Sequence, residues 1–209
     1  MSGSVPPKPA LRARWRRRRG EALPGSGAAI LAVARRQVPA LLPPDRLLGL
    51  WWPLPGEPDL LPLREVLPEH LALPAIVPWN GAGAGAPAGR RLIYRRWREG
   101  QGLARDLCGI PAPALEDDAP EGLEPERLGL LLVPALAVDA AGLRLGSGGG
   151  WYDRLRADPR WRAVPALAVL PASCVADALP RDPWDVPFDG WIDEAGLHWA
   201  ATAAKRSGS

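Results

Sequence analysis

Apolar residues along the chain form short runs separated by polar or proline-rich segments. Their length and composition predict strands over residues 46–54, 71–79, 91–97, 129–139 and 164–170. The run at 129–139 shows no alternation, as expected for a strand that is buried on both faces. Helical spacing predicts helices over residues 8–23, 26–38, 56–70 and 150–157, with Ser26 as the N-cap of the second.

Predicted strands and helices alternate along the chain, and this order determines the expected fold class. It predicts an α/β, Rossmann-like, three-layer domain with a mostly parallel central sheet and helices on both faces. We expect one domain over residues 8–202, flexible tails at 1–7 and 203–209, and a low-complexity loop at 81–89. In such sheets ligands bind outside the carboxyl ends of the strands.

A glycine-rich stretch follows the buried run, in the segment "LRLGSGGGWYDRLRA" at residues 143–157. Glycine permits positive φ and leaves the main chain open to a ligand. Successive N–H groups in such a loop, with the start of the next helix, can bind an anion. Arg144 and Arg154 could add bidentate hydrogen bonds to phosphate, and Asp153 could hold a divalent cation beside it.

The stretch is neither of the two common nucleotide-binding glycine motifs. No G-K-[ST] follows it, and Trp151 stands where G-x-G-x-x-G requires its third glycine. A hairpin tip without a ligand is the alternative interpretation of the glycines alone. The flanking arginine and aspartate favour phosphate binding.

Positive charge is concentrated near the N-terminus. The formal net charge is +3, residues 12–19 hold six arginines, and the rest of the chain has 20 basic and 23 acidic side chains. This distribution indicates a local anionic partner and argues against a nucleic-acid surface over the whole protein. A solvated helix face is the alternative interpretation, and a nucleic-acid-binding module with strong salt dependence is a rival function.

The remaining composition predicts a cytoplasmic protein. Cys108 and Cys174 fit neither metal nor redox spacing, so we interpret them as reduced thiols. The longest apolar run has about eleven residues, at 128–138, which is too short to cross a bilayer. We therefore expect neither a membrane span nor an export signal.

The segment "VPALAVDAAGLRLGSGGGWYDR", residues 133–154, resembles the hallmark of the 5-formyltetrahydrofolate cyclo-ligase family, also called methenyltetrahydrofolate synthetase. That hallmark is a proline, an apolar run ending in aspartate, a turn, and R-L-G-x-G-x-G-Y-Y-D. Ser147 stands where an aromatic or basic residue is common, and Trp151 replaces the first tyrosine. Weaker matches follow along most of the chain in the family's order.

The resemblance implies a reaction that depends on ATP and Mg²⁺. It converts 5-formyltetrahydrofolate to 5,10-methenyltetrahydrofolate and releases ADP and phosphate. In the family's mechanism the formyl oxygen attacks the γ-phosphoryl group, and N10 then closes the ring with loss of phosphate. The partners would be these small molecules, not nucleic acid or membrane, and the protein would be a monomer.

The resemblance also implies roles for individual residues. Lys8 and Arg12, in "KPALR", match the Lys-x-x-x-Arg at the start of the family's first helix, and Arg16 would continue their face. The expected ATP site comprises Lys8, Arg12, Arg144, Gly146, Ser147, Gly148, Gly149, Gly150 and Tyr152. Lys8 and Arg144 would act in catalysis, whereas Glu57, Trp97 and Tyr152 would contact the folate. Asp153 would bind Mg²⁺, with Asp189 or Asp185 as a second ligand.

Two departures from the family pattern leave an alternative function open. Ala112 stands where the family usually has glutamate, and Asp193 stands where it usually has threonine. The alternative is a catalytically weak relative that binds nucleotide or folate. Retention of Lys8, Arg12 and Arg144 favours the active enzyme.

Overall fold

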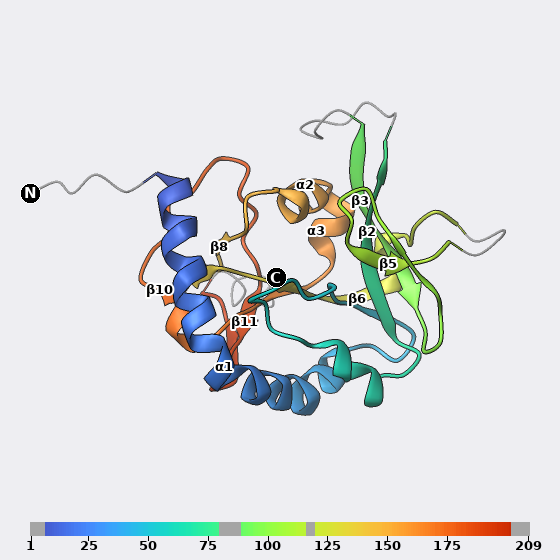
Figure 1. Cartoon of the computed structure of the whole chain (residues 1–209), viewed down its shortest axis with the longest axis horizontal. Coiled ribbons are helices and arrows are strands. Elements are labelled where there is room, and N and C mark those ends of the chain that lie inside the picture. The colour runs from blue at the N-terminus through green and yellow to red at the C-terminus, as the bar shows by residue number, and fades with distance from the viewer. Residues whose placement is uncertain (1–6, 80–88, 116–119, 202–209) are drawn as a thin grey trace, which may run out of the picture.

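A computed structural model describes residues 7–79, 89–115 and 120–201 of the chain (Figure 1). The expected tails at 1–7 and 203–209 and the loop at 81–89 fall almost entirely outside these residues. The described part contains a central seven-stranded sheet with the strand order β12-β11-β9-β6-β1-β2-β3. Its strands are β1 (Leu47–Gly49), β2 (Leu71–Pro78), β3 (Arg90–Trp97), β6 (Leu128–Pro134), β9 (Ala166–Val169), β11 (Gly190–Ile192) and β12 (Leu197–Trp199).

The sheet is mostly parallel, as predicted. The five inner strands pair in parallel, and only the two edge strands, β3 and β12, pair with their neighbours in antiparallel fashion. Side chains of β6 alternate between two cores, so that Leu131 and Val133 face one and Leu130 and Leu132 face the other. Helices cover both faces, which confirms the three-layer α/β class.

One long helix replaces the two helices predicted near the N-terminus. The helix α1 (Lys8–Leu41) continues through Pro24, and the Ser26 hydroxyl donates to the Ala22 carbonyl oxygen inside the helix. Ser26 is therefore not an N-cap, and that prediction was wrong. Proline removes one backbone donor and bends a helix without having to end it. Figure 1 shows the two halves of α1 running in different directions.

The other helices are short. They are α2 (Trp151–Ala157), α3 (Pro159–Ala163) and the 3₁₀ turns η1 (Leu61–Glu65), η2 (Pro125–Arg127) and η3 (Ala172–Cys174). The predicted helix at 56–70 is reduced to η1, because prolines interrupt this segment. No helix within the described residues is long and apolar enough to span a membrane.

The single strand predicted over 129–139 is two strands in different sheets. β6 ends at Pro134, and β7 (Ala137–Asp139) lies between β10 (Val175–Ala176) and β8 (Arg144–Leu145). Both halves of the run are buried, so no polar residue marks the break in the sequence. A third, two-stranded sheet pairs β4 (Leu103–Arg105) with β5 (Pro111–Pro113).

The turn between β7 and β8 places the glycine-rich stretch and depends on Gly142. Its φ is +80°, and an added Cβ would lie 2.2 Å from the carbonyl oxygen of Phe188. We expect Gly142→Ala to lower the free energy of unfolding by about 2–3 kcal/mol, measured by urea denaturation. Gly56→Ala is the matched control, since Gly56 has φ +79° and open space at Cβ. Equal losses in the two variants would contradict the predicted clash.

Candidate active site

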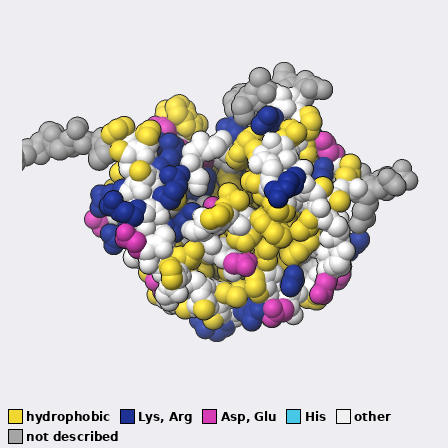
Figure 2. Space-filling model, viewed as in Figure 1, with side chains coloured by type: hydrophobic (Ala, Val, Ile, Leu, Met, Phe, Trp, Pro, Cys, Tyr) yellow, Lys and Arg dark blue, Asp and Glu magenta, His cyan; other side chains and the backbone are white. Residues whose placement is uncertain are grey.

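A cavity of about 740 Å³ opens beside the N-terminal half of α1. Four segments supply most of its wall: the start of α1, the chain after β1, residues 144–154, and the loop that holds Asp182 and Asp185. Apolar residues of β2 and β3 close the opposite side. Figure 2 shows basic side chains gathered along α1 next to this hollow. The cavity lies beyond the carboxyl ends of β1 and β6, where α/β sheets bind ligands.

The whole glycine-rich stretch, Gly146–Gly150, lines the cavity. Gly148 and Gly150 have φ values of +115° and +64°, which residues other than glycine rarely adopt. A Cβ on Gly146 would lie 2.7 Å from a guanidinium nitrogen of Arg144, and one on Gly150 would lie 2.8 Å from Arg154. The glycines therefore let two arginines approach the main chain closely.

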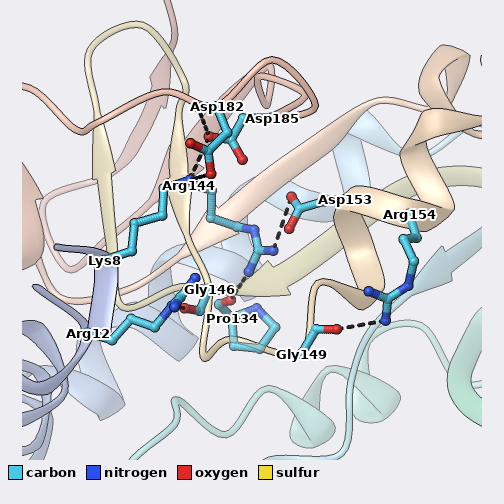
Figure 3. A network of polar contacts seen from close by, with 10 residues as sticks. All are labelled: Lys8, Arg12, Pro134, Arg144, Gly146, Gly149, Asp153, Arg154, Asp182 and Asp185. Atoms are coloured by element: carbon cyan, nitrogen blue, oxygen red, sulfur yellow. Dashed lines mark hydrogen bonds and ion pairs between the residues drawn. The ribbon is translucent and has the colours of Figure 1, made fainter. Parts of the chain in front are cut away.

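Arg144 is held rigidly at the base of this stretch. Its side chain is 5% exposed, Nη1 donates to the Pro134 carbonyl oxygen at 3.2 Å, and Nη2 lies 3.7 Å from Asp153 Oδ1 (Figure 3). The guanidinium carbon lies 5.4 and 5.3 Å from the ring centroids of Tyr152 and Phe188. Such packing fixes the direction of a charge before a ligand arrives.

Two more arginines bracket the stretch. Arg12 Nε donates to the Gly146 carbonyl oxygen at 3.3 Å, and Arg154 Nη2 donates to the Gly149 carbonyl oxygen at 2.7 Å. The Arg154 guanidinium also lies 4.6 Å from the Trp151 ring centroid. Arg12, Arg144 and Arg154 thus approach the glycines from α1, β8 and α2.

Lys8 has two carboxylate partners that the sequence did not reveal as such. Its Nζ donates to Asp182 Oδ2 and, at 3.0 Å, to Asp185 Oδ2 (Figure 3). Burial disfavours the charge on Lys8, but the two hydrogen bonds outweigh burial and raise the pKa of the ammonium group. Asp185, considered above as a second magnesium ligand, is thus a partner of Lys8. The Asp-x-x-Asp spacing was the available signal for this pair.

Glu57 lines the cavity from the loop after β1, and its side chain is 6% exposed. Its Oε2 accepts from the Leu54 N–H at 3.1 Å, and its Oε1 lies 3.8 Å from Arg19 Nη2. Burial raises the pKa of Glu57. Arg19 was not predicted, and Arg16, which was expected to continue the face of Lys8 and Arg12, is exposed. Seven residues separate Arg12 from Arg19, which is two helical turns and was the signal available.

Aromatic residues line the cavity, but Trp97 is not one of them. Tyr152 lies in the wall, and burial raises its pKa to about 12. Trp97 is 7% exposed and packs in the core on the other face of the sheet, so its predicted contact with folate is not supported. Trp51, Trp52, Trp151 and Trp184 line the cavity instead.

The two aspartates predicted as metal ligands lie in different places. Asp153 lines the cavity, and its side chain is 26% exposed. Asp189 does not line it: Oδ2 accepts from the Ala166 N–H at 2.8 Å and lies 4.0 Å from Arg156 Nη2. This hydrogen bond joins the start of β9 to the residue before β11. The location of Asp189 therefore gives no support to a role in binding magnesium. Within the described part of the chain, no three His, Cys, Asp or Glu side chains cluster as a metal site.

The departures from the family pattern at Ala112 and Asp193 do not line the cavity, whereas those at Ser147 and Trp151 do. Ala112 is 2% exposed and packs in a small core with Ala75, Val77 and Ile93. Asp193 is 2% exposed, and its Oδ1 accepts from the N–H groups of Ala195 and Gly196 in the turn before β12. Ala112 and Asp193 therefore support local structure and are not part of the cavity wall.

Curated proteins with similar sequences are cyclo-ligases. A 5-formyltetrahydrofolate cyclo-ligase of Mycolicibacterium smegmatis is 32% identical over 144 residues, which is 68% of this chain and 70% of the relative. The cyclo-ligase of Escherichia coli K12 is 28% identical over 64% of this chain and 69% of its own length.

Solved structures give the same fold. A 5,10-methenyltetrahydrofolate synthetase of Aquifex aeolicus superposes with a TM-score of 0.67, at 24% identity and 93% coverage of both chains. That of Mycoplasma pneumoniae gives a TM-score of 0.59 at 19% identity, covering 90% of this chain and 98% of its own. The 5-formyltetrahydrofolate cyclo-ligase family model matches residues 7–193. The chain therefore belongs to the 5-formyltetrahydrofolate cyclo-ligase family.

Proposed function

We propose that this chain converts 5-formyltetrahydrofolate to 5,10-methenyltetrahydrofolate in a reaction that consumes ATP and requires Mg²⁺. The observation that carries the proposal is the arrangement of a single cavity. One wall holds the glycine-rich stretch with Arg144 and Asp153, and another holds Glu57, with aromatic rings between them. Phosphoryl transfer depends on positioning and charge neutralisation, which is what the first wall offers.

The glycine wall is suited to a triphosphate. Arg12 of α1 and Arg144 of β8 approach Gly146–Gly150, Lys8 of α1 lines the same cavity, and glycine leaves the backbone open to phosphate oxygens. Lys8 would exchange one of its carboxylate partners for a phosphate oxygen when the nucleotide enters. Arg144, already oriented, would neutralise charge that develops on the transferred phosphoryl group.

The residues present are compatible with a magnesium ion. Mg²⁺ is usually bound through one or two carboxylates together with phosphates and waters. Asp153 supplies one carboxylate beside the glycine stretch, so a cluster of several acids is not required. When bound, the ion would neutralise negative charge on the phosphate oxygens.

The second wall is suited to the folate. Glu57 would accept hydrogen bonds from pterin N–H groups, and Tyr152 offers a ring face between the two ends of the cavity. With both substrates held, the formyl oxygen attacks the γ-phosphorus and the bond to ADP breaks. N10 then attacks the activated formyl carbon, and the ring closes as the phosphate leaves and N10 loses its proton to solvent or to the departing phosphate. The chain's part is to hold the reacting atoms together and exclude water.

Mixing the protein with 5-formyltetrahydrofolate, ATP and Mg²⁺ tests this proposal directly. We expect the absorbance band of methenyltetrahydrofolate to grow only in the complete mixture, and to stop when any component is omitted. Folded protein that binds ATP without growth of the band would contradict the proposal and favour the binding-protein alternative.

We further propose that the protein is a cytoplasmic monomer whose partners are small molecules alone. Size-exclusion chromatography with and without nucleic acid would check the oligomeric state and the absence of nucleic-acid binding.

A further inference from the structure

Two oppositely charged side chains are buried together behind the folate wall. Arg19 of α1 is 4% exposed and the Glu57 side chain is 6% exposed, with 3.8 Å between Arg19 Nη2 and Glu57 Oε1. Arg19 Nη1 also donates to the Ala135 carbonyl oxygen at 3.0 Å. Burying a charged side chain is costly unless it is paired with an opposite charge. Arg19 and Glu57 therefore each depend on the other, and the reason for keeping this pair beside the cavity needs an explanation.

The two members of the pair differ in their access to ligand. Glu57 lines the cavity, whereas Arg19 does not, so Arg19 reaches a ligand in the cavity through Glu57 and makes no direct contact with it. Its other contact, Ala135, follows directly after Pro134, whose carbonyl oxygen holds Arg144. Neighbouring carbonyls at the end of β6 therefore anchor an arginine for each end of the cavity.

We propose that Arg19 is a positioning residue, which keeps the Glu57 carboxylate ionised and aimed into the cavity so that it can accept hydrogen bonds from the N–H groups of the folate. The inference rests on the proposed function of the cavity. It assigns to Arg19 a role in substrate affinity that differs from a merely structural contribution to α1.

The electrostatic surroundings of Glu57 give this role a measurable sign. Among the described residues, the ionisable groups that act on it are Arg19 from α1, Arg144 from β8 and Tyr152 from α2. Burial raises the pKa of Glu57, and the Leu54 N–H, Arg19 and Arg144 oppose that rise. Without Arg19 the pKa rises further, so Glu57 takes up its proton at a higher pH and then loses its capacity as an ionised acceptor.

The test compares Arg19→Gln with the wild-type protein in the methenyltetrahydrofolate assay. We expect kcat/KM for 5-formyltetrahydrofolate to fall roughly tenfold near pH 7, as for the loss of one charge-assisted hydrogen bond. The acid limb of its pH profile should move to higher pH, while KM for ATP stays unchanged. Arg19→Lys, which keeps the charge, should recover part of the loss.

Arg17→Gln is the matched control, because Arg17 lies on the same helix with its side chain 76% exposed. It should keep the wild-type profile, which also corrects for titration of the substrate itself. An acid limb at the wild-type pH in Arg19→Gln, or equal rises in KM for both substrates, would overturn the inference. Thermal unfolding of each variant shows whether lost stability accounts for the change.

A double-mutant cycle with Glu57→Gln provides a second, independent test. If Arg19 acts through Glu57, adding Arg19→Gln to Glu57→Gln should change KM for folate little, since the carboxylate is already absent. Additive losses would overturn the inference, and Arg19→Lys replaces Arg19→Gln in the cycle if the latter fails to fold. A silent wild-type protein would instead refute the proposed function, so the two failures are distinguishable.

Discussion

Arg144→Ala should reduce kcat/KM for the cyclisation by about 10³-fold or more, the range observed when a group that stabilises transition-state charge is removed. Arg144 is the cationic side chain with the most contacts that fix its direction at the glycine wall. It is 5% exposed, bonded to Pro134 and packed between the rings of Tyr152 and Phe188. Alanine removes the charge together with these contacts, and a water molecule in the vacated space cannot supply that charge.

Arg144→Lys separates charge from geometry. Lysine keeps the positive charge but loses the planar fork that contacts Pro134 and faces Asp153 at once. We expect a loss intermediate between the wild-type protein and Arg144→Ala, with the larger part in kcat. Steady-state rates with each substrate varied, together with circular dichroism of both variants, would measure this.

A variant that folds, binds ATP and retains wild-type turnover would contradict the role given to Arg144. Arg154→Ala is an informative comparison, because Arg154 also contacts the glycine stretch but is less buried. Its guanidinium packs over Trp151 at the edge of the cavity, where water can take over part of its role. We expect a smaller loss there, of about tenfold, consistent with one hydrogen bond to a charged group.

The parts of the site that could be predicted from the sequence are those in which the chemistry is local. Gly146–Gly150, Arg144 and Asp153 lie within ten residues, so their spacing already brings them together. The parallel sheet could be predicted from the alternation of apolar runs with helices. Each of these patterns depends on neighbours in the chain, and neighbours in the chain stay neighbours in the fold.

The sequence did not reveal features that depend on contacts between distant parts of the chain. Asp182 lies 174 residues from Lys8, and no periodicity predicts that pair. Trp97 follows Leu92 in β3 by five residues, so strand alternation puts it on the opposite face from Leu92, which lines the cavity. Aromatic character was visible in the sequence, whereas the face on which it lies depends on the register of β3 against β2.

The prediction of two separate helices at the N-terminus was wrong for a different reason, which concerns Pro24. Proline and glycine at 24 and 25 resemble the gap between two helices, but Ile30, Val33 and Val38 pack the second half of α1 against the sheet. Tertiary packing therefore outweighs the local cost, and the helix bends instead of ending. The first half of α1 places Lys8 and Arg12 in the cavity wall and Arg19 beside Glu57.

Asp153→Asn should raise the Mg²⁺ concentration needed for half-maximal rate by roughly 10- to 100-fold, as expected for loss of a charged ligand contact worth about 1.5–3 kcal/mol. Asparagine keeps the size and one oxygen of the side chain, so the wall retains its shape. Initial rates measured against free Mg²⁺ at saturating substrates give the concentration directly. Calorimetric titration of ATP with and without Mg²⁺ provides a readout that does not require turnover.

The same variant tests a competing role for Asp153, in which it serves only to orient Arg144 across 3.7 Å. In that case Asp153→Asn would lower kcat by the same factor at every Mg²⁺ concentration, and the half-maximal concentration would not move. Asp189→Asn is the discriminating control. Because Asp189 lies outside the cavity and accepts from the Ala166 N–H, its replacement should reduce stability without changing the Mg²⁺ requirement. If the Mg²⁺ concentration for half-maximal rate rises in Asp189→Asn and stays at the wild-type value in Asp153→Asn, the assignment of the magnesium ligand is reversed.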